Sequence, residues 1–145
     1  MPGFVSAADI RYLKEVMDDF GLQATVLPDL SRTLDGPAAD RYEKISPGGT
    51  PLSRIRMMGG SRASIEFGRT LQERLSAANV LEGKFSVPRH SLGTPIGLRE
   101  SDCLFDMLES LAGKPTPKKH ALERGRLVDA YVDAHKYLFG KRVIV

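Results

Sequence analysis

Two aspartates near the end of the chain have the spacing of a shared cation site. Asp129 and Asp133 are four residues apart in a segment of helical periodicity, so both carboxylates are expected on one helix face. Like charges repel at this spacing, and a shared cation would reverse the sign of the interaction. A hard cation takes six or more oxygen ligands, so the others would come from water or another chain. The alternative, which spacing alone favours, is a solvated face paired with Arg126 and Lys136.

Two glycine-containing turns are candidates for binding an anion. Gly48-Gly49-Thr50 and Gly59-Gly60-Ser61 each precede a short element, where backbone N–H groups can point at a negatively charged ligand. Ordinary turns have the same composition, and we favour that interpretation. The sequence contains no dinucleotide-binding, phosphate-loop or nucleophile-elbow motif. No catalytic or cofactor-binding residue is therefore predicted from a motif.

The cysteine and the histidines do not indicate a site by themselves. Cys103 is the single cysteine, so one copy of the chain cannot build an internal disulfide or an all-cysteine zinc or iron–sulfur site. Its neighbours Leu104-Phe105 favour a small core thiol. His120 and His135 lie too far apart on one predicted helix to share a metal, and His90 has no neighbouring acid or nucleophile.

Composition places the chain among soluble globular proteins. It has 145 residues, 41% hydrophobic and 27% charged, which fits one domain of ordinary size. The net charge of +3 comes without a basic run, so we expect no nucleic-acid partner. No apolar stretch reaches the length of a membrane span, and the N-terminus lacks the features of a signal peptide. We therefore expect no membrane partner and, from the single cysteine, a reducing cytoplasmic location.

Hydrophobic periodicity and turn residues predict alternating helices and short strands. A first helix is expected from a Ser6–Asp9 capping box to a stop at Gly21. A long loop follows from Pro28 to Thr50, and loops of this length are usually functional, interfacial or disordered. Further helices are predicted over residues 52–58, 69–81, 99–112 and 118–139, and strands over residues 24–27, 62–67, 85–87 and 142–145. This alternation is typical of an α/β domain with a mostly parallel sheet.

Both ends of the chain interrupt that pattern. The chain ends inside its most convincing strand, residues 142–145, and it begins at a Pro-Gly turn that leads directly into a helix. A buried parallel strand needs neighbours and a crossover helix. We therefore expect a piece of a longer polypeptide, truncated at both ends.

A series of short motifs resembles the β-type subunits of nitrogenase component 1 and their cofactor-assembly paralogues. The strongest match is Glu123-Arg124-Gly125-Arg126-Leu127-Val128-Asp129, followed by Asp133-Ala134-His135 and Gly140-Lys141-Arg142. The upstream motifs agree in order, and they are Leu27-Pro28-Asp29-Leu30-Ser31, Leu34-Asp35-Gly36, Gly48-Gly49-Thr50, Pro95-Ile96-Gly97-Leu98 and Gly113-Lys114-Pro115. Each motif is weak alone, but their order and spacing together are specific across nearly the whole chain.

The resemblance implies a fold, an assembly and an electron-transfer function. Family subunits contain three Rossmann-like α/β domains and form α2β2 heterotetramers, so residues 1–145 would be a single Rossmann-like, three-layer domain from the middle of a β-type subunit. The complex accepts electrons from an ATP-hydrolysing iron protein and carries iron–sulfur clusters and, in some members, an iron–molybdenum-type cofactor. The cluster cysteines of β-type subunits belong to the first domain, and Cys103 matches none of them. The segment would then be structural, in contact with the α-type subunit and a second β subunit.

The same resemblance implies a role for one pair of residues, and three functions remain open for the chain. In catalytic β subunits the aspartates that match Asp129 and Asp133 help to bind a mononuclear metal between subunits, and the loop 28–50 would then be interfacial. The leading expectation is part of an oxidoreductase of nitrogen fixation. The first alternative is a scaffold on which the iron–molybdenum cofactor matures. The second, which discards the resemblance, is a free-standing α/β module that binds an anion at Gly48-Gly49-Thr50.

Overall fold

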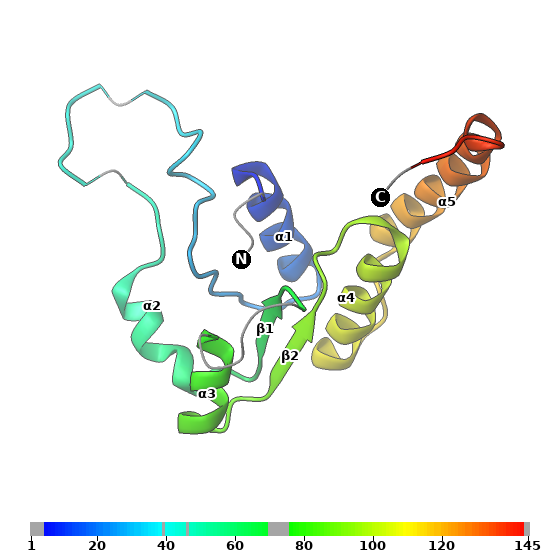
Figure 1. Cartoon of the computed structure of the whole chain (residues 1–145). Coiled ribbons are helices and arrows are strands. Elements are labelled where there is room, and N and C mark those ends of the chain that lie inside the picture. Colours follow the sequence, from blue (N-terminus) through cyan, green and yellow to red (C-terminus); the bar gives the residue numbers. More distant parts are fainter. Residues whose placement is uncertain (1–4, 39, 46, 70–75, 144–145) are drawn as a thin grey trace. The chain divides into compact units, whose positions relative to one another are not determined.

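A computed structural model describes residues 5–38, 40–45, 47–69 and 76–143 (Figure 1). In chain order the elements are α1 (Ala7–Asp19), α2 (Leu52–Met57), the 3-10 helix η1 (Met58–Gly60), β1 (Ser64–Phe67), α3 (Ala77–Phe85), β2 (Arg89–Leu92), α4 (Gly97–Ala112) and α5 (Lys118–Leu138). The chain divides into two compact units, Met1–Thr94 and Pro95–Val145. The single domain predicted over residues 1–145 stays a prediction.

The first helix begins and ends where the sequence predicts. The Ser6 hydroxyl accepts a hydrogen bond from the Asp9 N–H at 3.1 Å, and the Asp9 carboxylate accepts one from the Ser6 N–H at 2.9 Å. These bonds satisfy two of the N–H groups that a helix start leaves without partners. Gly21 follows the helix with φ of 70°, a left-handed conformation that glycine adopts without steric cost. The apolar side of α1 is buried through residues Ile10, Val16, Met17 and the following Phe20.

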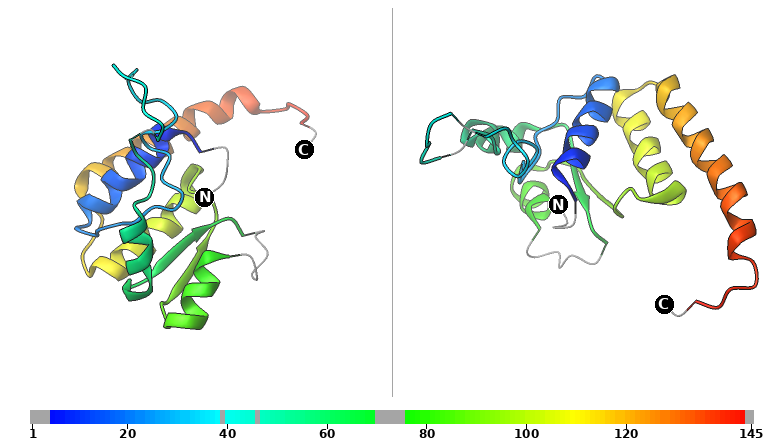
Figure 2. Two further views of the ribbon diagram at one scale, coloured as in Figure 1. Left: turned by 90° about the vertical axis from the view of Figure 1, so that its left-hand side faces the viewer. Right: turned by 90° about the horizontal axis from the view of Figure 1, so that it is seen from above.

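The first unit contains a parallel pair of strands. β1 and β2 pair in register from Ser64 opposite Arg89 to Phe67 opposite Leu92. α3 connects the two strands along the chain and packs against both (Figure 2). Parallel pairing requires such a crossover. The predicted α/β fold with a parallel sheet and the predicted strand over 62–67 are therefore confirmed.

Two predicted elements around α3 are displaced. The helix predicted over residues 69–81 begins instead after Ser76, whose hydroxyl accepts the Asn79 N–H at 3.1 Å, and residues 70–75 lie outside the described part. The strand predicted over residues 85–87 is wrong, because Phe85 still belongs to the helix and Ser86 adopts φ of 57°. The chain reverses at Ser86, so the strand starts only at Arg89.

The strand predicted over residues 24–27 is also wrong. The Thr50 hydroxyl donates to the Val26 carbonyl at 2.5 Å and accepts from the Asp29 N–H at 3.0 Å. The side chain of Thr50, at the far end of the loop, therefore occupies the Val26 carbonyl, which a strand would use to pair with a neighbouring strand. Of the strand predicted over residues 142–145, Arg142 and Val143 are not in a strand, and the last two residues lie outside the described part.

The second unit is a pair of helices. The predicted helices over residues 99–112 and 118–139 are confirmed as α4 and α5, with boundaries that differ by one or two residues. Gly113 ends α4 with φ of 67°. Leu104, Met107 and Leu108 are buried. Buried His120 of α5 packs its ring against Phe105 of α4, with 5.4 Å between centroids and the two ring planes tilted by 56°. No helix in the described part of the chain is long and apolar enough to cross a membrane.

Candidate functional site

The two aspartates of the predicted metal site lie on α5 and are exposed. Asp129 and Asp133 are one helical turn apart, as the sequence predicts. The Lys136 ammonium donates to the Asp133 carboxylate at 3.3 Å, with both side chains more than 60% exposed. Arg126 pairs with Glu123 instead of Asp129. At such exposure these ion pairs are weak, so the carboxylates can accept another cation.

The oxygen donors of α5 are too few for a complete cation site. Among the described residues, no group of three or more His, Cys, Asp or Glu side chains is close enough to hold one ion. Asp129 and Asp133 suit a hard cation in ligand type, because carboxylate oxygen is the ligand that such ions prefer. Further ligands would have to come from water or from another chain, as the sequence implies. The metal site stays a prediction.

The other sequence candidates occupy separate places. Cys103 is a free, half-buried thiol on α4, consistent with a small core residue. His120 is buried against Phe105, and His135 is exposed on α5, where its ring Nδ1 lies next to the Val132 carbonyl. His90 lies on β2, in the other unit. Within the second unit, the structure does not bring Cys103, His120 and His135 together as one site.

The glycine turn before α2 is held by the protein's own backbone. Gly48 and Gly49 have φ of 123° and 79°, so both use the conformational freedom of glycine. The Thr50 hydroxyl is occupied by the Val26 carbonyl and the Asp29 N–H. This arrangement explains the Gly-Gly-Thr motif as a turn that joins the loop to the segment after α1.

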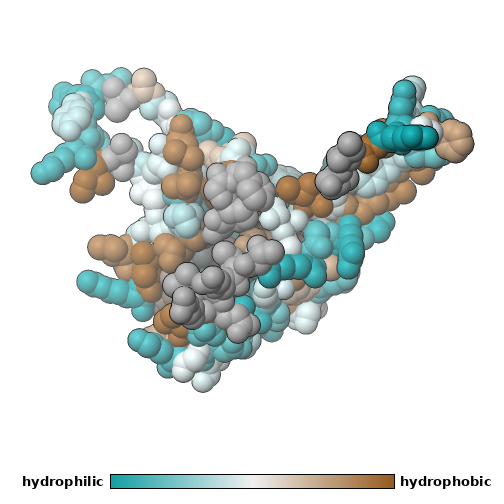
Figure 3. Space-filling view, viewed as in Figure 1, coloured by the Kyte–Doolittle hydropathy of each residue, from teal (hydrophilic) through white to brown (hydrophobic). Residues whose placement is uncertain are grey.

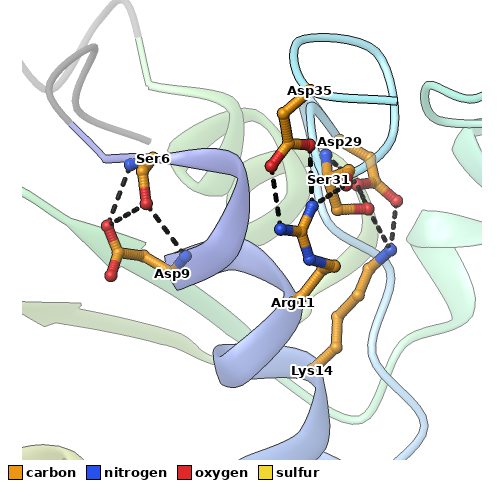
Figure 4. Close-up of polar contacts among 7 residues, drawn as sticks. All are labelled: Ser6, Asp9, Arg11, Lys14, Asp29, Ser31 and Asp35. Atoms are coloured by element: carbon orange, nitrogen blue, oxygen red, sulfur yellow. Dashed lines mark hydrogen bonds and ion pairs between the residues drawn. The ribbon is translucent and has the colours of Figure 1, made fainter. Parts of the chain in front are cut away.

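A polar cluster that sequence reasoning missed joins α1 to the long loop (Figure 4). The Lys14 ammonium donates to Asp29 Oδ2 at 2.5 Å and to Ser31 Oγ at 3.1 Å. The Arg11 guanidinium forms two parallel hydrogen bonds of 2.8 Å with the Asp35 carboxylate and a third with the Ser31 carbonyl. The partners are 15 to 24 residues apart, so no local periodicity reveals them. The one sequence signal for this cluster is that Asp29, Ser31 and Asp35 lie in the motifs that resemble nitrogenase component 1 subunits.

Electrostatics in this cluster favour the ionised carboxylates. Burial acts to raise the pKa of Asp29, but hydrogen bonds from Lys14 and Ser31 outweigh it and lower that pKa below its ordinary value. Hydrogen bonds from Arg11 lower the pKa of Asp35.

A cavity of about 220 Å³ opens beside the cluster, between the end of α1, residues 23–26 and Arg54. The cluster therefore anchors the loop and shapes the wall of this cavity.

The lowered pKa of Asp29 predicts a loss of stability in acid. A carboxyl group whose folded pKa is depressed contributes stability that is present above the unfolded value of about 3.9 and lost as pH falls through the folded pKa. Urea unfolding at pH 7 and at pH 3 should show a lower midpoint in acid. The Lys14→Met variant removes a cause of the shift and should lose less stability between the two pH values. Equal losses in both proteins would contradict a role for the Lys14–Asp29 pair.

Comparison with known proteins assigns the family. The model of the nitrogenase component 1 type oxidoreductase family matches residues 1–145. The chain belongs to this family. The resemblance seen in the motifs of the sequence is thereby confirmed across the whole chain.

The related proteins are of two β-type kinds. The chain is 35% identical over 143 residues to the nitrogenase molybdenum-iron protein beta chain of Clostridium pasteurianum, covering 99% of this chain and 31% of that protein. It is 32% identical over 146 residues to the nitrogenase iron-molybdenum cofactor biosynthesis protein NifN of Bradyrhizobium diazoefficiens, covering 100% of this chain and 30% of that protein. The chain thus spans about a third of the length of these relatives.

A solved structure confirms the fold of this family member. "Nitrogenase Cp1 at pH 6.5" matches with a TM-score of 0.86 at 35% sequence identity, covering 97% of this chain and 30% of that one. The fold of nitrogenase component 1 therefore extends over nearly all of the chain. The matched relatives cover both β-type options that the motifs left open.

Proposed function

We propose that this chain acts as a segment of the β-type subunit of a nitrogenase component 1 oxidoreductase, which passes electrons through iron–sulfur clusters during nitrogen fixation. The observation that carries the proposal is the 35% identity to a molybdenum-iron protein beta chain over 99% of the chain. The structural match at a TM-score of 0.86 supports it. The proposed partners are an α-type subunit, a second β subunit and an ATP-hydrolysing iron protein as electron donor, all in the cytoplasm.

The contribution of this segment would be structural and interfacial. Cys103 is the single cysteine of the chain, so one copy has too few thiolates for an all-cysteine cluster site. Cluster ligands of the complex would therefore come from other parts of the assembly. Large apolar side chains are exposed on both units, among them Tyr42 at 94% and Phe139 at 90%, so each unit offers apolar surface that a contact could cover.

A scaffold for cofactor assembly is the second candidate. The cofactor biosynthesis proteins NifN of several bacteria are 30–32% identical to this chain over 93–100% of its length. A scaffold complex would hold a precursor cluster and transfer it, without reducing dinitrogen itself. Both functions need an α-type partner, so the product of the assembled complex distinguishes them.

The test is reconstitution of the full-length polypeptide with the α-type component 1 subunit from the same organism. We expect a stable complex that reduces dinitrogen when the iron protein and ATP are supplied. A complex that does not turn over but donates a cluster to an apo-enzyme would support the scaffold instead. Failure to form any complex would contradict both.

Asp129 and Asp133 are proposed as ligands of a mononuclear metal between two β subunits. The pair lies on one face of α5, both carboxylates are exposed, and only Lys136 competes for Asp133 in the described structure. The two carboxylates would hold a hard cation such as calcium or ferrous iron, with the remaining ligands supplied by the second subunit. The bound ion would join the two chains electrostatically.

Replacing both aspartates by asparagine should lower the metal content of the assembled complex. The amides keep the size of the side chains but lack the charge that a divalent ion requires. Equilibrium dialysis with calcium or iron measures the stoichiometry, and Glu123→Gln, on the same helix but paired with Arg126, is the matched control. Unchanged stoichiometry in the double variant would remove Asp129 and Asp133 from the site.

A further inference from the structure

Side-chain contacts tie α5 to α4 near the connection between the two helices, which lie side by side (Figure 2). Glu109 Oε1 accepts hydrogen bonds from the Thr116 N–H and from the Thr116 hydroxyl, both at 2.7 Å. Nearer the start of α4, the Phe105 and His120 rings lie with their centroids 5.4 Å apart. These contacts join the helices at the end where α4 leads into α5.

Two further contacts between the helices lie closer to the aspartate pair of α5. The Arg124 guanidinium donates to both carboxylate oxygens of Asp102, at 2.7 and 2.8 Å. These hydrogen bonds lower the pKa of Asp102, which favours the ionised carboxylate. At the start of α4, a Cβ atom at position 97 would lie 3.1 Å from the Tyr131 hydroxyl oxygen. The tyrosine therefore lies against Gly97, where the absence of a side chain leaves room for it.

The residues of α5 that contact α4 lie opposite the aspartates around the helix axis. At about 100° of rotation per residue, His120, Arg124 and Tyr131 lie within about 40° of one another. The mid-point between Asp129 and Asp133 lies about 180° away from them. Contact with α4 through one side of α5 therefore turns the opposite side, with both carboxylates, away from α4.

We infer that Arg124 and Tyr131 are positioning residues for the aspartate pair, because their contacts with α4 fix the rotation of α5 and so the direction of both carboxylates. The inference rests on the proposed function, in which the remaining ligands of a shared cation belong to the second β subunit. Neither side chain would touch the ion, since both lie on the opposite side of the helix.

Burial does not fix this rotation within the helix pair. Residues 129–138 are all exposed in the structure, and Figure 3 shows hydrophilic and apolar residues together on the surface of this half of α5. A helix whose apolar face is packed keeps its rotation because turning would expose that face. In this half of α5 the contacts at Arg124 and Tyr131 take that role.

Rotation of α5 has a large effect on a cation site that two chains share. A carboxylate at the helix surface lies about 5–6 Å from the axis, so a rotation of about 20° moves it by about 2 Å. Oxygen ligands of calcium lie about 2.3–2.6 Å from the ion, a range much narrower than this displacement. The helix itself sets the spacing between Asp129 and Asp133. Their alignment with ligands on another chain depends on the rotation.

The test measures the cation affinity of the assembled complex with manganese, a hard divalent ion that suits oxygen ligands. Electron paramagnetic resonance of the free ion gives the dissociation constant for the wild type, Arg124→Asp and Tyr131→Ala. Each variant should bind the ion at least ten-fold more weakly, as is typical when a group that orients a metal ligand is lost. Arg124→Asp makes the helix more negative, which by itself would tighten cation binding. Weaker binding therefore reports lost position and not changed charge.

Two further variants control for folding and for charge. Arg124→Asp plus Asp102→Arg restores the ion pair with its charges exchanged and should recover most of the affinity. Arg126→Gln removes an arginine of the same helix that pairs with Glu123 instead of α4, and it should not weaken binding. Size-exclusion chromatography selects assembled complexes, and Arg124→Gln replaces Arg124→Asp if the latter does not assemble.

The outcomes separate this inference from the proposed function. If the wild type binds an ion and the single variants bind it as tightly, other contacts set the rotation of α5 and the inference is overturned. An exchanged pair that does not recover the affinity overturns it for Arg124. If the wild-type complex reduces dinitrogen but binds no ion, the metal site and the inference fail while the proposed function stands. If no complex forms, the proposed function fails as well.

Discussion

Replacing Phe20 with alanine should lower the free energy of unfolding of the first unit by about 3–5 kcal/mol. The side chain is 1% exposed and is among the largest that are fully buried. It follows α1 directly, where it shares the interior with Ile10 and Met17. Truncation removes the apolar transfer energy of the ring and leaves a cavity that the surrounding side chains fill only partly. Urea unfolding followed by circular dichroism measures the change.

Phe139→Ala is the matched control for this prediction. The same ring is removed, but Phe139 is 90% exposed, so its loss should change the free energy of unfolding of the isolated chain by no more than about 0.5 kcal/mol. If Phe20→Ala lowers the free energy of unfolding by no more than about 0.5 kcal/mol, as expected for Phe139→Ala, burial of Phe20 does not stabilise the unit.

Leu108→Ala should have the second-largest effect, a loss of about 2–5 kcal/mol in the helix pair of the second unit. Leu108 is fully buried at 0% exposure, with Leu104 and Met107 on the same side of α4. These three are the buried residues of α4, so the cavity weakens a main source of the stability of that helix. Amide hydrogen exchange of α4 measures the local free energy of opening, which should fall toward that of a fraying segment.

Leu138→Ala tests whether this effect depends on position. Leu138 is the last residue of α5 and is 66% exposed, so the same truncation should leave exchange in α4 nearly unchanged. Slow exchange in α4 of the Leu108→Ala variant would show that the two helices are stabilised mainly by other contacts. The bidentate Arg124–Asp102 pair is one such contact, with distances of 2.7 and 2.8 Å.

The sequence by itself determined α1, α4 and α5 and the family of this protein. The Ser6–Asp9 capping box, the stop at Gly21 and the periodic apolar residues of α4 and α5 act within a few residues, and the structure keeps all of them. The ordered motifs identified a β-type component 1 relative before any contact was known. The spacing of Asp129 and Asp133 also placed both on one helix face. These features are local, so the chain encodes them without reference to distant partners.

Only the tertiary structure decided what happens between distant segments. Residues 24–27 have the composition of a strand, but the Thr50 hydroxyl from across the loop occupies the Val26 carbonyl. Lys14 and Asp29 form an ion pair across 15 residues, which no periodicity predicts. The exposure of the apolar side chains of α2 depends on which elements pack nearby. Hydrogen bonds and burial between distant residues depend on how the whole chain folds, and a local pattern carries no record of them.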